Sequence, residues 1–181
     1  VIVDAEPDAV IYKGVRPGVT RDEFAAHIES GAVVDDLVAV PVQAGDCHYL
    51  PSGTCHALGA GLLVAEVQTP SDTTFRVYDW GRTDRELHID ESLECIRFDD
   101  DGDESRCGET IEVDGITSKR LTETPYFRIE RLQTDGGATM PIETSGMPVV
   151  WMVLAGDIAI SGPGFELSLI HISEPTRQKP I

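Results

Sequence analysis

The sequence predicts a mainly β protein, and the observations that predict it lie close together in residues 44–82. Two runs of strand-like composition, residues 48–50 and 62–68, flank a series of turn-forming Pro, Ser and Gly residues. His56 lies between these runs, directly after a Gly-Thr turn. Such a placement is typical of a ligand at the mouth of a small β-barrel, where inward-facing positions converge.

The elements that precede this block alternate between strands and short helices. Residues 1–4 and 9–13 are rich in Val, Ile and Tyr and surround a turn at residues 5–8, which predicts two strands. Farther along the chain, a short helical turn is expected near residues 34–37. It leads into a strand over residues 38–42.

Local capping signals predict a helix between these elements. Thr20 is a good N-cap residue, and Glu23 three positions later completes a capping box. Phe24 and Ile28 lie four residues apart and give the helix one apolar face. Gly31 is expected to end it.

The pattern then becomes β, with strands expected over residues 47–50, 61–67 and 74–78. A short helix is expected over residues 90–96, because its apolar residues fall on one side. Residues 99–104 are acidic and contain Gly, which indicates a solvated linker.

Strand-like runs return in the last third of the chain, over residues 127–133, 148–154 and 156–161. The last two runs are joined by an Ala-Gly-Asp turn. Their order resembles the opening hairpin of a second barrel.

Four motifs in the informative block agree in order and spacing with one known pattern. They are Gly45-Asp46, Pro51-Ser52-Gly53-Thr54-Cys55-His56-Ala57, Ala65-Glu66-Val67-Gln68 and Ser71-Asp72-Thr73-Thr74-Phe75-Arg76-Val77-Tyr78-Asp79. Together they resemble the metal-site segment of type I mannose-6-phosphate isomerases, especially the short bacterial form, within the cupin superfamily. The resemblance runs more loosely from Asp4 to about Phe98.

The resemblance implies a cupin jelly-roll barrel with a short helical insertion, followed by a truncated second cupin-like barrel. Residues 1–98 are expected to form the C-terminal part of the metal-binding barrel, residues 99–124 a linker and residues 125–166 the start of the second barrel. Residues 167–181 are expected to be a tail derived from a sequencing adapter, because the string LSLIHISEPTR resembles the translation of such an adapter. The alternative is a genuine strand over residues 167–172.

The resemblance also assigns roles to three residues. It implies that His56 is a metal ligand, that Arg76 points at the sugar as a catalytic residue, and that Glu66 lines the substrate cavity. A neutral imidazole suits Zn²⁺, the expected cofactor, as it suits other divalent metals. An inward Arg is costly to bury unless an anion meets it, and a carboxylate in an otherwise apolar run indicates an interior polar site.

Each of these residues also has a purely structural interpretation. His56 could be a strand-end imidazole whose hydrogen bonds are satisfied within the fold. Arg76 could be a solvated strand residue that pairs with Glu66 or Asp79, so that a Glu66–Arg76 ion pair has no role with substrate. The dipeptides Cys47-His48 and Cys55-His56 lie eight residues apart, which does not match a zinc knuckle; we interpret His48 as a rim imidazole.

Charge and cysteine content limit the kinds of partner and the cellular compartment that we expect for this protein. With 14 Lys and Arg against 32 Asp and Glu, the net charge of −18 argues against nucleic acid and anionic membranes as partners. An anionic sugar phosphate would need a local positive pocket made by metal and Arg. The four cysteines show no CxxC spacing, and no apolar run approaches the roughly 20 residues that span a bilayer. Reduced thiols in a cytoplasmic protein are expected.

The implied activity is a metal-dependent aldose–ketose isomerase that interconverts mannose 6-phosphate and fructose 6-phosphate. The family takes its other metal ligands from a Gln-x-His pair and a Glu that would precede Val1. We therefore expect this sequence to hold one ligand of about four, and to be inactive and metal-free alone. The alternatives are a non-catalytic sugar-binding cupin module and another metal-dependent cupin enzyme, such as an oxygenase or epimerase. The residues favour no particular oligomeric state.

Overall fold

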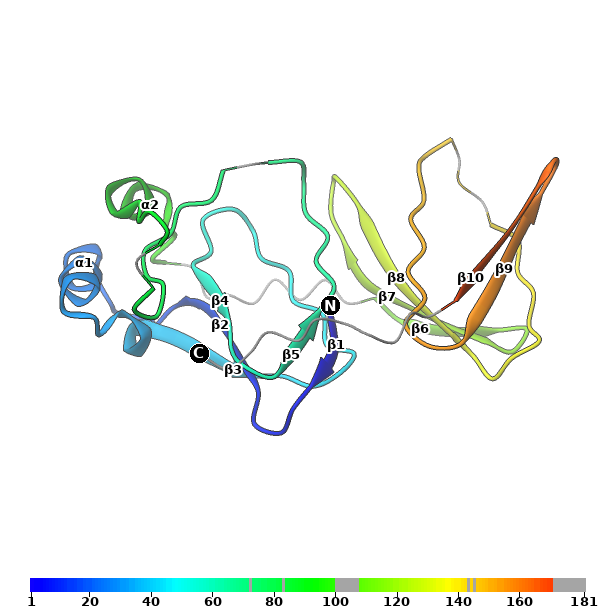
Figure 1. Cartoon of the computed structure of the whole chain (residues 1–181), viewed down its shortest axis with the longest axis horizontal. Helices are drawn as coiled ribbons and strands as arrows, with labels where there is room; N and C mark the ends of the chain where they lie inside the picture. Colours follow the sequence, from blue (N-terminus) through cyan, green and yellow to red (C-terminus); the bar gives the residue numbers. More distant parts are fainter. Residues whose placement is uncertain (72, 83, 100–107, 143, 145, 171–181) are drawn as a thin grey trace.

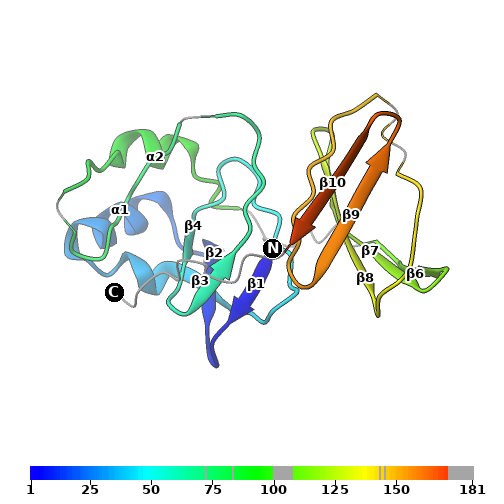
Figure 2. The ribbon, with the colours of Figure 1, turned by 45° about the vertical axis from the view of Figure 1, so that its right-hand side comes forward.

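The computed structural model describes residues 1–71, 73–82, 84–99, 108–142, 144 and 146–170 (Figure 1). These residues form two α-helices, one 3-10 helix and ten strands, and every strand pair among them is antiparallel. Figures 1 and 2 both place β6 to β10 at the end of the molecule opposite the helices. The predicted mainly β fold is therefore confirmed.

Two small sheets form the N-terminal part. Strands β1 (Ile2–Ala5) and β5 (Leu62–Val64) pair with each other. Strand β2 (Val10–Val15) lies between β3 (Leu37–Pro41) and β4 (His56–Leu58). This confirms the strands predicted over residues 1–4, 9–13, 38–42 and 61–67. Strand β5 is shorter than expected.

A buried apolar cluster joins the two small sheets. Its members come from β1, β2, β5 and the turn before β2, and they are Ile2, Ala9, Ile11 and Leu62. Removing this apolar surface from water favours the packing of one sheet on the other.

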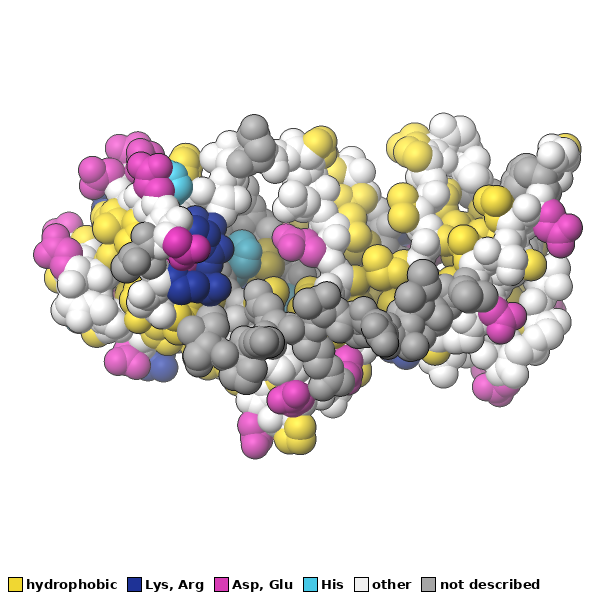
Figure 3. Space-filling model, in the orientation of Figure 1, with side chains coloured by type: hydrophobic (Ala, Val, Ile, Leu, Met, Phe, Trp, Pro, Cys, Tyr) yellow, Lys and Arg dark blue, Asp and Glu magenta, His cyan; other side chains and the backbone are white. Residues whose placement is uncertain are grey.

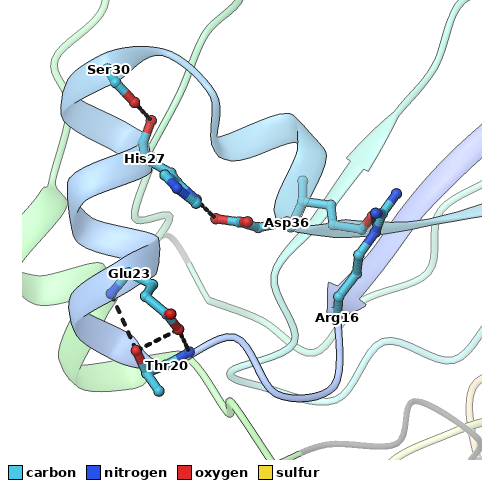
Figure 4. A network of polar contacts seen from close by, with 7 residues as sticks. Arg16, Thr20, Glu23, His27, Ser30 and Asp36 are labelled. Atoms are coloured by element: carbon cyan, nitrogen blue, oxygen red, sulfur yellow. Dashed lines mark hydrogen bonds and ion pairs between the residues drawn. The ribbon is translucent and has the colours of Figure 1, made fainter.

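Helix α1 (Arg21–Ser30) begins and ends where the capping signals predict. The Thr20 hydroxyl accepts a hydrogen bond from the Glu23 amide, and the Glu23 carboxylate accepts one from the Thr20 amide at 2.9 Å (Figure 4). Gly31 adopts φ +80°, the left-handed conformation that favours glycine at a helix end.

The apolar face of α1 forms the second core. Phe24 is fully buried and meets Phe98 edge to face, with ring centroids 5.6 Å apart. Helix α2 (Ile89–Cys95) packs against the same cluster through Leu93. The other buried members are Val15, Ile28, Val33 and Leu37.

A polar link joins α1 to the 3-10 helix η1 (Val33–Asp36). His27 Nδ1 lies 2.8 Å from the Asp36 carboxylate, whose side chain is 8% exposed (Figure 4). Arg16 adds two contacts, because its amide donates to the Asp36 carbonyl and its Nε donates to the Leu37 carbonyl. The end of α1 and the start of β3 are thereby held together.

The C-terminal part consists of a meander and a hairpin. Strands β6 (Thr110–Val113), β7 (Ile116–Glu123) and β8 (Arg128–Thr134) form one sheet. Strands β9 (Asp157–Gly162) and β10 (Phe165–Ile170) form the other, separate sheet. The predicted strands near residues 127 and 156 are confirmed by β8 and β9.

The segment predicted as a linker, residues 99–124, contains strands β6 and β7 in its second half. Its acidic part, residues 100–107, lies outside the described residues. Asp114 (φ +51°) and Gly115 (φ +75°) make the two-residue turn between these strands. Two consecutive left-handed residues suit the right-handed twist of a hairpin. The Asp-Gly dipeptide is the sequence signal for this turn.

Three predicted strands are absent from the described structure. Residues 47–50, 74–78 and 148–154 carry strand-like composition but join no ladder among the residues described. Composition measures how well side chains suit a pleated surface, whereas a strand also requires a neighbour with a free edge. Within the described ranges, no strand runs alongside these segments in a ladder.

The domain boundaries stay a prediction. Part of the expected tail, residues 167–181, lies in β10, where Leu167 is opposite Ile160. Residues 171–181 lie outside the described residues. No helix among the residues described has the length and apolar character that crossing a bilayer requires.

Candidate functional site

His56 opens strand β4, opposite Lys13 of β2 in the antiparallel register. The residue is exposed, and its Nδ1 lies 2.9 Å from the Thr54 carbonyl oxygen. A carbonyl can only accept, so Nδ1 carries the proton in this contact, and in the neutral ring the lone pair is then on Nε2. This is the arrangement that an imidazole needs to bind a metal through Nε2.

A complete metal site is not formed by the described residues. Among them, no group of three or more His, Cys, Asp or Glu side chains is placed to hold a metal ion. A catalytic zinc ion usually has three protein ligands and an open position. The residues described therefore do not fit a zinc ion on their own, and His56 remains one predicted ligand.

His48 is more buried than a rim position suggests. It is half-buried, and its Nε2 is buried without a hydrogen-bond partner in the described structure. Burial lowers the pKa of His48, and the positive charge of Lys13 lowers it further. Lys13 therefore has two imidazoles nearby, His56 across the strand pair and His48 within electrostatic range.

Arg76 is half-buried and lies in an irregular segment, which corrects its predicted position in the middle of a strand. Its carbonyl accepts a hydrogen bond from the His88 amide at 2.8 Å. Its Nη1 lies 3.5 Å from the Glu86 carbonyl, at the long limit for such a bond. Within the described part of the chain, the guanidinium forms no ion pair with Glu66 or Asp79.

Glu66 is exposed and follows β5 (Leu62–Val64) by two residues. The prediction that it lies within an apolar strand is wrong, because the β1–β5 ladder ends at Val64. The described structure places Glu66 in solvent and does not pair it with Arg76. Its assignment to the substrate cavity stays a prediction.

Asp79 is the charged residue of this region that sequence reasoning left without a role. Its side chain is only 4% exposed, and both carboxylate oxygens bind Arg85, at 2.7 Å from Nε and 2.5 Å from Nη2. Arg82 Nη2 lies 3.3 Å from the same carboxylate. The guanidinium groups of Arg82 and Arg85, three and six residues after Asp79, thus contact the same buried carboxylate.

The turn that follows Asp79 has an unusual backbone. Trp80 has φ +46° and Gly81 has φ +76°, so two successive residues are left-handed. The Trp80 ring lies 5.5 Å from that of Tyr78 and 6.5 Å from that of Tyr12 on β2. These aromatic contacts attach the turn to the N-terminal sheet.

The surface shows where positive charge gathers. In Figure 3, Lys and Arg side chains form one compact group beside a His, toward the end of the molecule that carries the helices. One Asp or Glu side chain lies against this group, and others are scattered around the rest of this face. In a chain of net charge −18, a basic group of this kind is a local exception that an anionic ligand can use.

Comparison with known proteins gives a consistent result. No family model matches the chain. It is 35% identical over 144 residues to mannose-6-phosphate isomerase ManA of Bacillus subtilis, and 32% identical over 144 residues to mannose-6-phosphate isomerase of Streptococcus mutans. Each match covers 77% of this chain and 45% of the relative, so the chain spans less than half the length of these relatives.

A solved structure agrees with the sequence matches. The crystal structure of the mannose 6-phosphate isomerase from Bacillus subtilis matches with a TM-score of 0.69 at 33% identity. The match covers 75% of this chain and 44% of that one. Fold and matched residues thus define a mainly β protein of the cupin type. Within that class, the matched residues are similar to the mannose-6-phosphate isomerases, as the four motifs predict.

Proposed function

We propose that this chain is part of a sugar isomerase that interconverts mannose 6-phosphate and fructose 6-phosphate. The observation that carries the proposal is the 32–36% identity, over 77% of the chain, to relatives named mannose-6-phosphate isomerase. Its expected partner is a small sugar phosphate. The thiols of Cys55 and Cys95 are free, which supports a reducing compartment such as the cytoplasm.

The proposed reaction moves a proton between two adjacent carbons through an enediolate. Negative charge develops on the two sugar oxygens, so a fixed cation beside them lowers the barrier. Arg76 is proposed as that cation, because its half-buried position limits the screening of its charge by water. Glu66 is proposed to accept hydrogen bonds from sugar hydroxyl groups.

A divalent metal, with Zn²⁺ as the proposed ion, would supply Lewis-acid stabilisation of the same oxygens. His56 is proposed as one of its ligands, through Nε2. Because the described residues offer no group of three donors, we propose that the 181 residues alone are inactive and bind no zinc stoichiometrically. Elemental analysis of the purified chain tests this statement, and one equivalent of zinc per chain would contradict it.

The activity itself is best tested in a chimera. The part of the Bacillus subtilis isomerase that this chain does not match would be joined to the chain, and turnover of mannose 6-phosphate would be measured with added Zn²⁺. We expect turnover in the chimera and a loss of about 100-fold or more in kcat when Arg76 is replaced by Ala. A folded, zinc-loaded chimera without turnover would overturn the proposed function.

A sugar-binding module without catalysis is the second candidate. It is favoured by the exposure of Glu66 and by the lack of a three-donor group among the described residues. Such a module would bind fructose 6-phosphate in a calorimetric titration while its chimera with the relative remained inactive. The two measurements together separate a binding role from a catalytic one.

A further inference from the structure

The segment that carries Arg76 is a loop closed on itself. The His88 amide donates to the Arg76 carbonyl at 2.8 Å, so the chain returns to its starting point after twelve residues. The Arg76 guanidinium points along the same route, with its Nη1 3.5 Å from the Glu86 carbonyl. The returning segment of this loop therefore contacts both the backbone of Arg76 and, at the long limit for a hydrogen bond, its guanidinium.

The Asp79 carboxylate stabilises this loop by contacts to residues within it. Arg85, three residues before the closing contact, binds both oxygens of this side chain. The Asp79 carbonyl also accepts a hydrogen bond from the Arg82 amide at 2.9 Å. Burial of the carboxylate to 4% exposure means that water cannot easily replace Arg85.

The backbone of the loop has an unfavourable conformation that these contacts stabilise. Trp80 has a positive φ that a bulky residue rarely adopts, and such a conformation persists only where surrounding contacts determine it. The neighbouring Tyr78 ring holds one side of Trp80. The contact with Arg85 holds Asp79, which immediately precedes Trp80 in the chain.

We propose that Arg85 is a positioning residue for Arg76, acting through the buried carboxylate of Asp79. This inference rests on the function proposed above, in which Arg76 meets the substrate. The planar guanidinium fork of Arg85 matches both carboxylate oxygens at once, which the single ammonium group of Lys cannot do. Arg85 therefore sets a direction as well as supplying a charge.

The test observes Arg76 directly and does not depend on activity. In the ¹⁵N-labelled chain, the Nε–Hε signal of Arg76 is assigned by its disappearance in Arg76→Lys. We expect Arg85→Gln and Arg85→Lys to shift and broaden this signal, and to speed hydrogen exchange of the His88 amide by about tenfold or more. Arg128→Gln, which removes an exposed pair with Glu130 on β8, is the matched control and should change neither.

The two variants at position 85 keep the proposal falsifiable. Arg85→Lys retains the charge, so it remains folded even where Arg85→Gln does not. An unchanged Arg76 signal in folded Arg85→Lys would overturn the positioning role, because charge alone would then suffice. Unchanged exchange of the His88 amide in the same variant would overturn it as well.

Turnover of the chimera gives an independent second measurement. We expect Arg85→Lys to lower kcat by about tenfold with KM little changed, because the affected interaction forms in the transition state. A wild-type chimera without turnover would refute the isomerase proposal but would not alter what the Arg76 signal shows about Arg85. An active chimera whose kcat is unaffected by Arg85→Lys would overturn the positioning role.

Discussion

Removing Arg85 should destabilise the protein more than removing its partner Asp79. The two side chains differ strongly in exposure, 40% for Arg85 and 4% for Asp79. In Arg85→Ala the carboxylate stays buried and keeps only the longer contact to Arg82 at 3.3 Å. In Asp79→Ala the guanidinium groups are already close to solvent and can turn into water.

The magnitudes follow from this asymmetry. Breaking a fully buried ion pair by removing one partner costs about 3–5 kcal/mol. The partial exposure of Arg85 lets water reach the vacated space, so we expect Arg85→Ala to lower the free energy of unfolding by about 2–3 kcal/mol. Asp79→Ala should lower it by about 1–2 kcal/mol, which corresponds to two charge-assisted hydrogen bonds replaced by hydration.

Urea unfolding, followed by far-UV circular dichroism and tryptophan fluorescence, measures both values. The double variant should cost little more than Asp79→Ala alone, so the coupling energy between the two positions should be close to the Arg85→Ala loss, about 2–3 kcal/mol. A larger loss in Asp79→Ala than in Arg85→Ala would refute the reasoning from exposure. So would a coupling energy near zero, since it would show that the contact contributes nothing net.

Four further outcomes follow from the described contacts. Phe24→Ala should lower the free energy of unfolding by about 3–5 kcal/mol in urea unfolding, because the ring is fully buried; a loss under about 1 kcal/mol would contradict this. Thr20→Ala should cost about 1 kcal/mol in the same assay, through loss of the helix cap. Burial lowers the pKa of His48, so the unfolded chain takes up its proton first as the pH falls below about 6.5. Stability should therefore be complete above that pH and decrease below it, and His48→Gln should flatten this dependence in urea midpoints. Burial raises the pKa of the Cys55 thiol to about 11, so iodoacetamide at about pH 8 should label exposed Cys95 and spare Cys55.

The elements that the sequence predicts best are those whose signals are local. Thr20, Glu23 and Gly31 define both ends of α1, because a helix satisfies its hydrogen bonds within a few residues of the chain. The turn at Asp114-Gly115 is equally local, and it could have been predicted from the same kind of signal. Its acidic surroundings favoured the linker interpretation instead.

The elements that the sequence mispredicts depend on distant partners. Residues 74–78 have the composition of a strand, but the segment returns on itself through the Arg76 carbonyl and the His88 amide. Whether a ladder forms there is decided by which backbone edge lies alongside, and composition carries no information on that point.

The candidate site also contains some features that local sequence signals predict and others that depend on distant contacts. The position of His56 at the start of a short strand follows from the Gly-Thr turn before it, and the register with Lys13 is an outcome of folding. Glu66 was expected inside an apolar strand, yet that strand ends two residues earlier. The Asp79–Arg85 contact could not be predicted, because it requires the left-handed turn at Trp80 to bring the two side chains together.

The same turn also brings two exposed guanidinium groups together at the surface. Arg82 and Arg85 contribute +2 and Asp79 contributes −1, so these three residues carry a net +1, and the exposed carboxylates of Asp84 and Glu86 flank Arg85 in the same loop. Because Asp79 is buried while both guanidinium groups are 40–46% exposed, the negative charge is hidden and the positive charge faces solvent. In the function proposed above, these exposed guanidinium groups would offer N–H donors to a sugar phosphate beside Arg76. One buried carboxylate accounts for both features: it fixes the loop backbone, and it holds two cations in place at the surface.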